Sequence, residues 1–190
     1  MYQVSKKSKH ISTFLLVLGK IAECWEAAGG FNFIRVRKLD DENILLEATD
    51  NKRALQLRTS LIKLEEGLYQ LTKSKDTVCL IRQDNTICRF PDIDRIIVKQ
   101  PSYQFKIAAC VSAHSSIYPI LINKSSFDNT FKFVNSGYID DFIKLVDESY
   151  REVTMKTNQF QYSPVQLEFK NSVFEVIYIV APMETAVNDI

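Results

Sequence analysis

The stretch "NFIRVRKLDDENILLEATDNKRALQLRTS", residues 32–60, holds three short segments that are separated by polar turns. In the first segment the apolar Ile34 and Val36 alternate with Arg35 and Arg37. This period of two is typical of a strand with one buried and one wet face. The stretch therefore predicts consecutive strands of an antiparallel sheet.

Two segments of the chain have helical periodicity instead. The first runs from His10 to Ala28 and ends at a Gly-Gly pair, and its apolar face comprises Phe14, Leu15, Leu18, Ile21, Ala22 and Trp25. The second runs from Ser136 to Ser149, and we expect Ser136 to be its N-cap. Its apolar face comprises Ile139, Phe142, Ile143 and Val146.

Most of the remaining segments read as strands with Gly and polar turns between them. They are "YQVSKK", "EEGLYQLTKSKDTVCLIRQDN", "YQFKIAACVSA", "IYPILINK", "REVTMKT", "SPVQLEFK" and "VFEVIYIVAPM". The last segment is almost continuously apolar, which indicates a central strand covered on both faces. The predicted fold class is α+β, with antiparallel sheets and two main helices packed on one side.

The composition is that of an ordinary globular protein. The chain has 190 residues, 46% of them hydrophobic and 25% charged, which allows one ordinary domain or two small ones. A net charge of +1 means that a nucleic-acid site would need its basic groups concentrated on one surface. No apolar run is long enough to cross a membrane, and we expect a cytoplasmic protein. The cysteines lack metal-site spacing and are predicted to be buried free thiols in a reducing compartment: Cys24, Cys79, Cys88 and Cys110.

The sequence gives no sign of an active site. It has no GxGxxG, P-loop, GxSxG or HExxH motif. The acids at 40–42 belong to a turn, and Asp140 and Asp141 fall in the first turn of the second helix, where negative charge favours the helix dipole. We expect no catalytic residues, metal or cofactor, and an unrecognised hydrolase or transferase site is the remaining alternative.

Three segments together resemble one family, the bacterial sliding clamp, which is the beta subunit of DNA polymerase III. They are "EATDNKRAL" at 47–55, "RFPDIDRII" at 89–97, and the C-terminal pattern "FVNSGYIDDFIKLV…EVTMKT…SPVQLEF…VFEVIYIVAPM". Each motif is weak alone, but they keep the family's order and span most of the chain. The resemblance implies a clamp fold and a role in DNA replication.

The chain is about half as long as three clamp domains of ordinary size would require. Residues 1–100 resemble the middle domain of the bacterial clamp, and residues 101–190 resemble an abbreviated C-terminal domain. An alternative is one clamp domain, 1–60 plus 128–190, with an inserted strand-rich segment at 61–127. Such compaction is expected of a phage-encoded relative.

The resemblance also implies a pocket for short hydrophobic peptides of a DNA polymerase and a clamp loader, located where the middle and last domains meet. The matching positions are Thr49, Arg53, Ala54, Pro91, Arg95, Ile96, Ile179, Val180, Pro182 and Met183. Pro91 ends a strand, so that the following apolar residues are free to face a groove. Ile96, Ile179 and Met183 would form an apolar floor. Arg53 and Arg95 would flank it and donate hydrogen bonds to a peptide.

A clamp encircles duplex DNA as a ring of subunits and contacts phosphates without reading sequence. The expected DNA contacts form a basic surface in the first third of the chain: Lys6, Lys7, Lys9, Lys20, Arg35, Arg37 and Lys52. The second helix argues against encirclement, because it carries more acids than bases: Asp140, Asp141, Asp147 and Glu148 against Lys144. The leading hypothesis is a processivity factor that oligomerises around DNA and tethers a polymerase. The alternative is a monomeric adaptor or decoy that binds replication proteins without encircling DNA.

Overall fold

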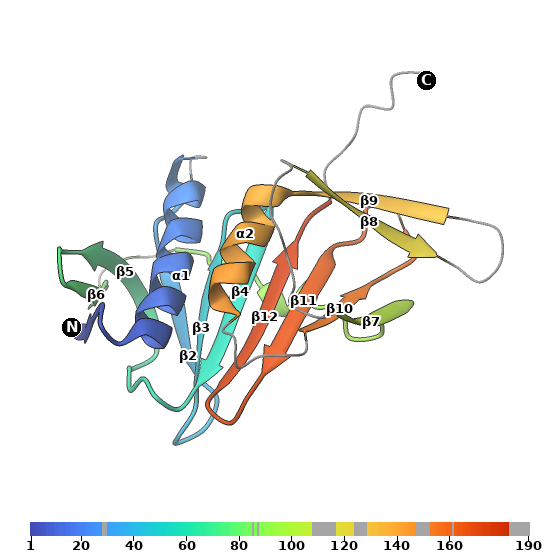
Figure 1. Cartoon of the computed structure of the whole chain (residues 1–190). Coiled ribbons are helices and arrows are strands. Elements are labelled where there is room, and N and C mark those ends of the chain that lie inside the picture. The colour runs from blue at the N-terminus through green and yellow to red at the C-terminus, as the bar shows by residue number, and fades with distance from the viewer. Residues whose placement is uncertain are drawn as a thin grey trace.

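The computed structural model describes residues 1–27, 30–84, 86, 88–107, 117–123, 129–146, 153–160 and 162–182 (Figure 1). These residues form a ten-stranded antiparallel sheet, a separate two-stranded hairpin and two helices. The order in the large sheet is β1-β6-β5-β2-β3-β4-β12-β11-β10-β7. Its strands are β1 (Tyr2–Ser5), β2 (Ile34–Lys38), β3 (Ile44–Thr49), β4 (Arg53–Thr59), β5 (Gly67–Lys73), β6 (Thr77–Arg82), β7 (Tyr103–Ile107), β10 (Val153–Thr157), β11 (Val165–Lys170) and β12 (Phe174–Val180). The hairpin pairs β8 (Ile117–Asn123) with β9 (Asn129–Asn135).

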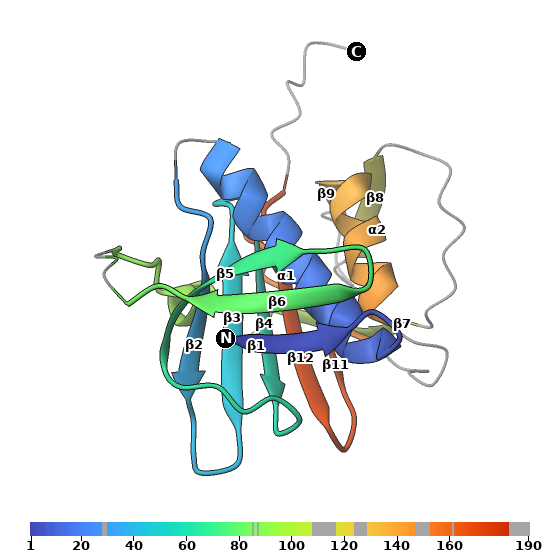
Figure 2. The same ribbon diagram turned by 90° about the vertical axis from the view of Figure 1, so that its left-hand side faces the viewer.

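Helix α1 (Lys9–Ala27) is the centre of the first half of the molecule. Its predicted apolar face is buried, with Leu15, Leu18 and Ile21 fully shielded from solvent. The helix contacts all strands from β1 to β6. Figure 2 shows how this is possible: β1, β5 and β6 run across the direction of β2, β3 and β4, so that the sheet turns around the helix.

Alternation along the strands divides the sheet into two faces. Ile34, Val36 and Leu57 point to the helix side and join the main apolar core. Residues between them, such as Arg35 and Gln56, point to the opposite face, which we call the outer face. The core therefore lies between the helices and one face of the sheet, and the outer face remains open to other elements.

The chain contains a structural repeat. A helix followed by three consecutive antiparallel strands occurs first as α1-β2-β3-β4 and again as α2-β10-β11-β12. The two units meet where β4 pairs with β12, with Ala54 opposite Ile179 and Arg53 opposite Val180. We call this junction the seam. Both helices lie on the same side of the sheet, next to each other across the seam (Figure 1).

Helix α2 spans Ser136–Leu145, and its N-cap lies one residue earlier than predicted. Asn135, rather than Ser136, is the N-cap, and its side-chain oxygen accepts a hydrogen bond of 2.8 Å from the Gly137 amide. The helix ends at Leu145 rather than Ser149, because Val146 takes an extended conformation.

The predicted α+β class, with antiparallel strands and two helices on one side, is confirmed. The last strand, β12, lies between β4 and β11 as its apolar sequence indicated. The prediction of buried thiols is wrong for Cys24, which is exposed because it lies off the apolar face of α1. Cys79 and Cys88 are half-buried, and Cys110 lies outside the described residues.

Candidate functional site

A cavity of about 290 Å³ opens on the outer face at one end of the seam. Four parts of the chain form it: the β3–β4 turn, a connecting segment after β6, the loop before β11 and the end of β12. The lining residues are Thr49, Asn51, Lys52, Arg53, Ala54, Pro91, Asp92, Ile93, Ile96, Tyr162, Pro164, Ile179 and Ala181. Segments more than a hundred residues apart in sequence thus share one concave surface.

The floor of the cavity follows from the register at the seam. Ala54 and Ile179 are paired across β4 and β12, and both point to the outer face. Ile93 packs on them and is almost fully buried. Ile93 belongs to a short 3-10 helix, η1 (Ile93–Arg95), within the connecting segment Phe90–Val98. We call this segment the strap, because it crosses the outer face.

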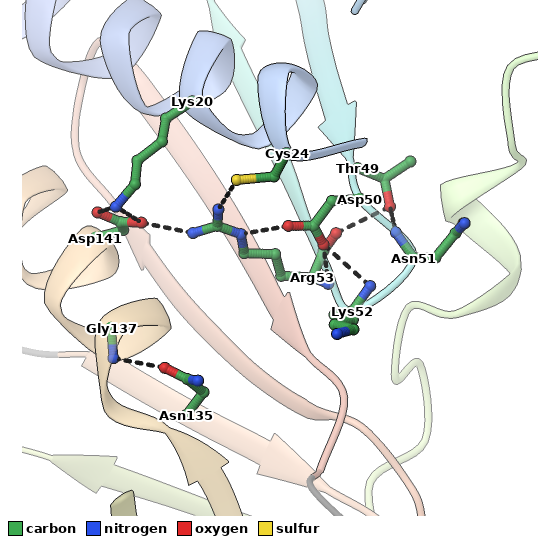
Figure 3. A network of polar contacts seen from close by, with 10 residues as sticks. All are labelled: Lys20, Cys24, Thr49, Asp50, Asn51, Lys52, Arg53, Asn135, Gly137 and Asp141. Carbon is green, nitrogen blue, oxygen red and sulfur yellow. Dashed lines mark hydrogen bonds and ion pairs between the residues drawn. The ribbon is translucent and has the colours of Figure 1, made fainter. Parts of the chain in front are cut away.

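The β3–β4 turn at the edge of the cavity is held by its own side chains (Figure 3). The Asp50 carboxylate accepts hydrogen bonds from the Lys52 and Arg53 amides at 3.0 and 2.9 Å. The Thr49 hydroxyl donates to the Arg53 carbonyl at 2.9 Å. Asn51 has a φ of 66°, a left-handed conformation that asparagine tolerates better than most residues. The turn is therefore a fixed wall of the cavity.

The rim combines apolar and charged groups. Ile96 is 45% exposed and Tyr162 is 68% exposed, so both present apolar surface to solvent. Lys52 is exposed beside them. Asp92 also lines the cavity. Its carboxylate pairs with Arg95 at 3.0 Å, and Arg95 does not line the cavity. An apolar floor with a charged rim is the form of site that accepts hydrophobic side chains of a peptide.

The structure brings together most of the residues that the sequence predicted for this pocket: Thr49, Arg53, Ala54, Pro91, Ile96 and Ile179. Val180 is not among them, because it neighbours Ile179 on β12 and points to the helix side, where it is fully buried. Arg95 and Pro182 do not line the cavity. Met183 lies outside the described residues.

Other lining residues were not anticipated. Ile93 is the most informative, since it supplies part of the floor directly from the strap. Tyr162 and Pro164 come from the loop before β11. That loop contains the Ser-Pro-Val pattern used in the family resemblance, so a signal was present in the sequence.

The Arg53 guanidinium, which was predicted to donate to a bound peptide, makes its contacts within the core. Its guanidinium lies on the helix side of β4 and only 2% of the side chain is exposed. It pairs with Asp50 at 2.8 Å and with Asp141 at 2.5 Å, and it approaches Cys24 Sγ at 3.3 Å (Figure 3). The guanidinium also lies over the Tyr138 ring, 4.5 Å from its centroid. Arg53 therefore joins β4 to α2 across the core.

Asp141, one of the acids of the second helix, does not belong to the exposed surface of that helix. Its side chain is 1% exposed and receives both Lys20 Nζ, at 2.7 and 2.8 Å, and the Arg53 guanidinium. Burial alone would raise the pKa of Asp141, but these hydrogen bonds and positive charges hold it below its ordinary value. Asp141 is thus an internal, neutralised acid rather than part of an exposed negative face. Asp147 and Glu148 lie outside the described residues.

The residues expected to contact DNA do not form one surface. Lys9 and Lys20 lie on α1, and Lys6 and Lys7 precede it. The arginines of β2 point to the outer face instead, because they alternate with buried Ile34 and Val36. Arg35 Nε and Arg37 Nε both pair with the buried carboxylate of Glu47, at 2.6 and 2.9 Å. Lys52 belongs to the turn beside the cavity.

The described residues contain no group of three His, Cys, Asp or Glu side chains that could hold a metal ion. Neither helix within the described ranges is long and apolar enough to cross a membrane.

Comparison with known proteins finds similar folds but no similar sequences. Neither protein-family models nor curated proteins give a significant match to this sequence. Solved structures do match. DNA polymerase III subunit beta from Borrelia burgdorferi superposes with a TM-score of 0.60 and 14% identity, covering 98% of this chain and 65% of that one.

Two further structures agree. The DNA polymerase III beta chain of Streptococcus pneumoniae has a TM-score of 0.64 and 11% identity, with 97% of this chain and 64% of that one covered. The Helicobacter pylori beta clamp, in a structure with a DNA ligase peptide, has a TM-score of 0.60 and 10% identity, with coverages of 92% and 64%. The chain thus has a clamp-like fold that spans less than two thirds of each of these proteins.

Proposed function

We propose that this protein is a clamp-like processivity factor that binds a short hydrophobic peptide of a DNA polymerase or clamp loader in the cavity at the seam. One observation carries the proposal. All three stretches that the sequence resemblance assigned to a partner pocket contribute to the cavity, together with the loop before β11, and Ala54, Ile96 and Ile179 converge there. Its volume of about 290 Å³ is near the lower end of ligand pockets and suits one or two apolar side chains.

The domain organisation fits this proposal. We take residues 1–100 and 101–190 as two abbreviated clamp domains that meet at the seam. Strands β5 and β6 extend the sheet of the first half, and β7 extends that of the second half, beside β10. The segment 61–127 thus contributes strands to both halves, which favours two domains over one domain with a single insert.

Peptide binding is tested with a fluorescently labelled peptide that carries Leu and Phe anchors, by anisotropy. The Ile96→Asp variant places a charge at the apolar rim, and we expect at least about a tenfold loss of affinity. Ile81→Asp is the matched control, because Ile81 is similarly exposed, at 39%, but lies on β6 away from the cavity. Equal affinity of the two variants would refute the pocket.

The second part of the proposal concerns ring formation. Strands β1 and β7 are the outer strands of the ten-stranded sheet, and edge strands can pair between subunits. We propose that copies of this cytoplasmic protein join through these edges around duplex DNA, with the helices facing the phosphates. Light scattering would then give a multiple of the 21.9 kDa chain mass.

A monomeric adaptor that binds replication proteins without encircling DNA is the second candidate, and a specific observation favours it. The exposed side of α1 carries Glu23 and Glu26 as well as Lys9 and Lys20, and Lys20 is already paired with Asp141. Such a mixed surface attracts phosphates weakly. A 21.9 kDa species that binds peptide but shows no salt-dependent DNA affinity would establish this candidate.

A further inference from the structure

The strap Phe90–Val98 forms one wall of the cavity, and polar contacts on both sides of the seam hold it to the outer face. Its middle carries Ile93, which fills the floor, and Ile96, which lines the opening. Apart from η1 it has no regular backbone structure. The position of this wall of the cavity therefore depends on side-chain contacts between the strap and the sheet.

The first of these contacts joins the strap to the first half of the sheet through Asp94. Its carboxylate accepts from Arg37 Nη2, at 3.0 and 3.1 Å to its two oxygens, and from Gln56 Nε2 at 2.9 Å. Beneath it lies Glu47, which is fully buried and accepts from the same two side chains and from Arg35. Glu47 thus orients the donors that Asp94 uses.

A second contact holds the start of the strap. The Arg35 guanidinium lies over the Phe90 ring, 4.6 Å from its centroid. The Phe90 ring also packs perpendicular to the ring of Trp25 on α1, with centroids 5.8 Å apart. The end of the strap is held on the other side of the seam, where the Val98 amide donates a 2.7 Å hydrogen bond to Gln166 Oε1 on β11.

We propose that Asp94, supported by Glu47, is the positioning residue of the peptide site: it keeps the strap docked so that the wall is formed before the peptide arrives. The inference rests on the proposed function of the cavity. Arg37 and Gln56 are hydrogen-bonded to the buried Glu47, which orients both side chains toward Asp94. If the strap is already docked, peptide binding carries no free-energy cost for ordering it. The apparent affinity for the peptide is proportional to the fraction of molecules with a docked strap.

The test uses Asp94→Ala with two measurements on the full chain. The first is hydrogen exchange of the strap amides, in particular that of Ile96, which donates to the Ile93 carbonyl at 3.0 Å. We expect this amide to exchange about tenfold faster or more in the variant, because a charge-assisted contact to a fixed arginine is lost. Amides of β4 and β12 keep their wild-type rates, whereas a general loss of stability would speed exchange across the whole sheet.

The second measurement is peptide affinity by anisotropy, where we expect about a threefold or greater loss. Asp84→Ala is the matched control, since Asp84 pairs with Arg82 of β6 at 2.9 Å and does not line the cavity. Binding that persists in Asp94→Ala at wild-type affinity, or unchanged exchange in the strap, overturns the inference alone. A wild-type protein that binds no peptide overturns the proposed function, and the positioning role falls with it.

Discussion

Substitution of Asp141 by Asn tests whether the buried ion pair between β4 and α2 holds the two halves of the molecule together. In the wild type, the Arg53 guanidinium is 2% exposed and has two carboxylate partners, Asp50 and Asp141. The variant leaves Arg53 buried with one partner. Breaking a buried pair from one side costs about 3–5 kcal/mol, and the remaining pair with Asp50 reduces this to about 2–4 kcal/mol.

The other partner of Asp141 contributes less. Half of the Lys20 side chain is exposed, and such pairs are worth about 0.2–1 kcal/mol. Lys20→Met therefore serves as the control for the loss of a single contact to Asp141. We expect its free energy of unfolding to stay within about 1 kcal/mol of the wild type.

Urea unfolding measures both variants. With an m-value of about 2 kcal/mol per molar urea, Asp141→Asn lowers the midpoint by about 1–2 M without a change of slope. The double variant Arg53→Met with Asp141→Leu removes the Arg53–Asp141 pair but leaves the buried Asp50 carboxylate with only the Lys52 and Arg53 amides, so it should recover only part of this loss. A loss below about 1 kcal/mol in Asp141→Asn would refute the reasoning.

The same pair predicts how stability depends on pH. The pKa of Asp141 in the folded protein lies below its ordinary value, because Lys20 and Arg53 stabilise the charged form. The unfolded chain then binds the proton more readily, so the contribution is fully present above about pH 4 and is lost as the pH falls through the folded pKa. The difference in stability between the wild type and Asp141→Asn should therefore shrink at acid pH and stay constant from pH 6 to 8.

Substitutions at three further positions test local features, each by urea unfolding. Asn135→Ala removes the N-cap of α2 and should cost about 1 kcal/mol, whereas Asn135→Asp should cost little. Asn51→Gly relieves the left-handed turn beside the cavity and should leave stability unchanged or slightly raised, whereas Asn51→Val should lower it by about 1–2 kcal/mol. Leu18→Ala opens a hole under α1 and should cost about 2–5 kcal/mol; a smaller loss would show that the core collapses into it.

The sequence predicted the fold well because its signals are local. The alternation of Ile34 and Val36 with arginines, and the apolar face around Leu18, report directly on which side of each element is buried. The start of α2 was harder. Asn135 and Ser136 are both good N-cap residues, and only the geometry of the Gly137 amide decides between them.

The candidate site was predicted less completely, and the missed parts share a cause. Val180 is the neighbour in sequence of the lining residue Ile179, but strand alternation sends its side chain to the other face. Arg53 is among the lining residues, but its guanidinium lies on the helix side. Assigning every consecutive residue of a motif to the pocket ignores this alternation. Arg35 and Arg37 looked like a basic surface because Glu47, their partner on β3, is twelve and ten residues away in the chain.

The central position of β12 has a consequence for how the chain is made. Strand β4 is complete at Thr59, but its neighbour across the seam spans Phe174–Val180, which is synthesised more than a hundred residues later. Until the ribosome releases that segment, β4 presents a row of unsatisfied amide and carbonyl groups next to an apolar core, which is a template for pairing with other nascent chains. A stop codon shortly before residue 174 would make that exposure permanent and yield an aggregating fragment rather than a smaller folded protein.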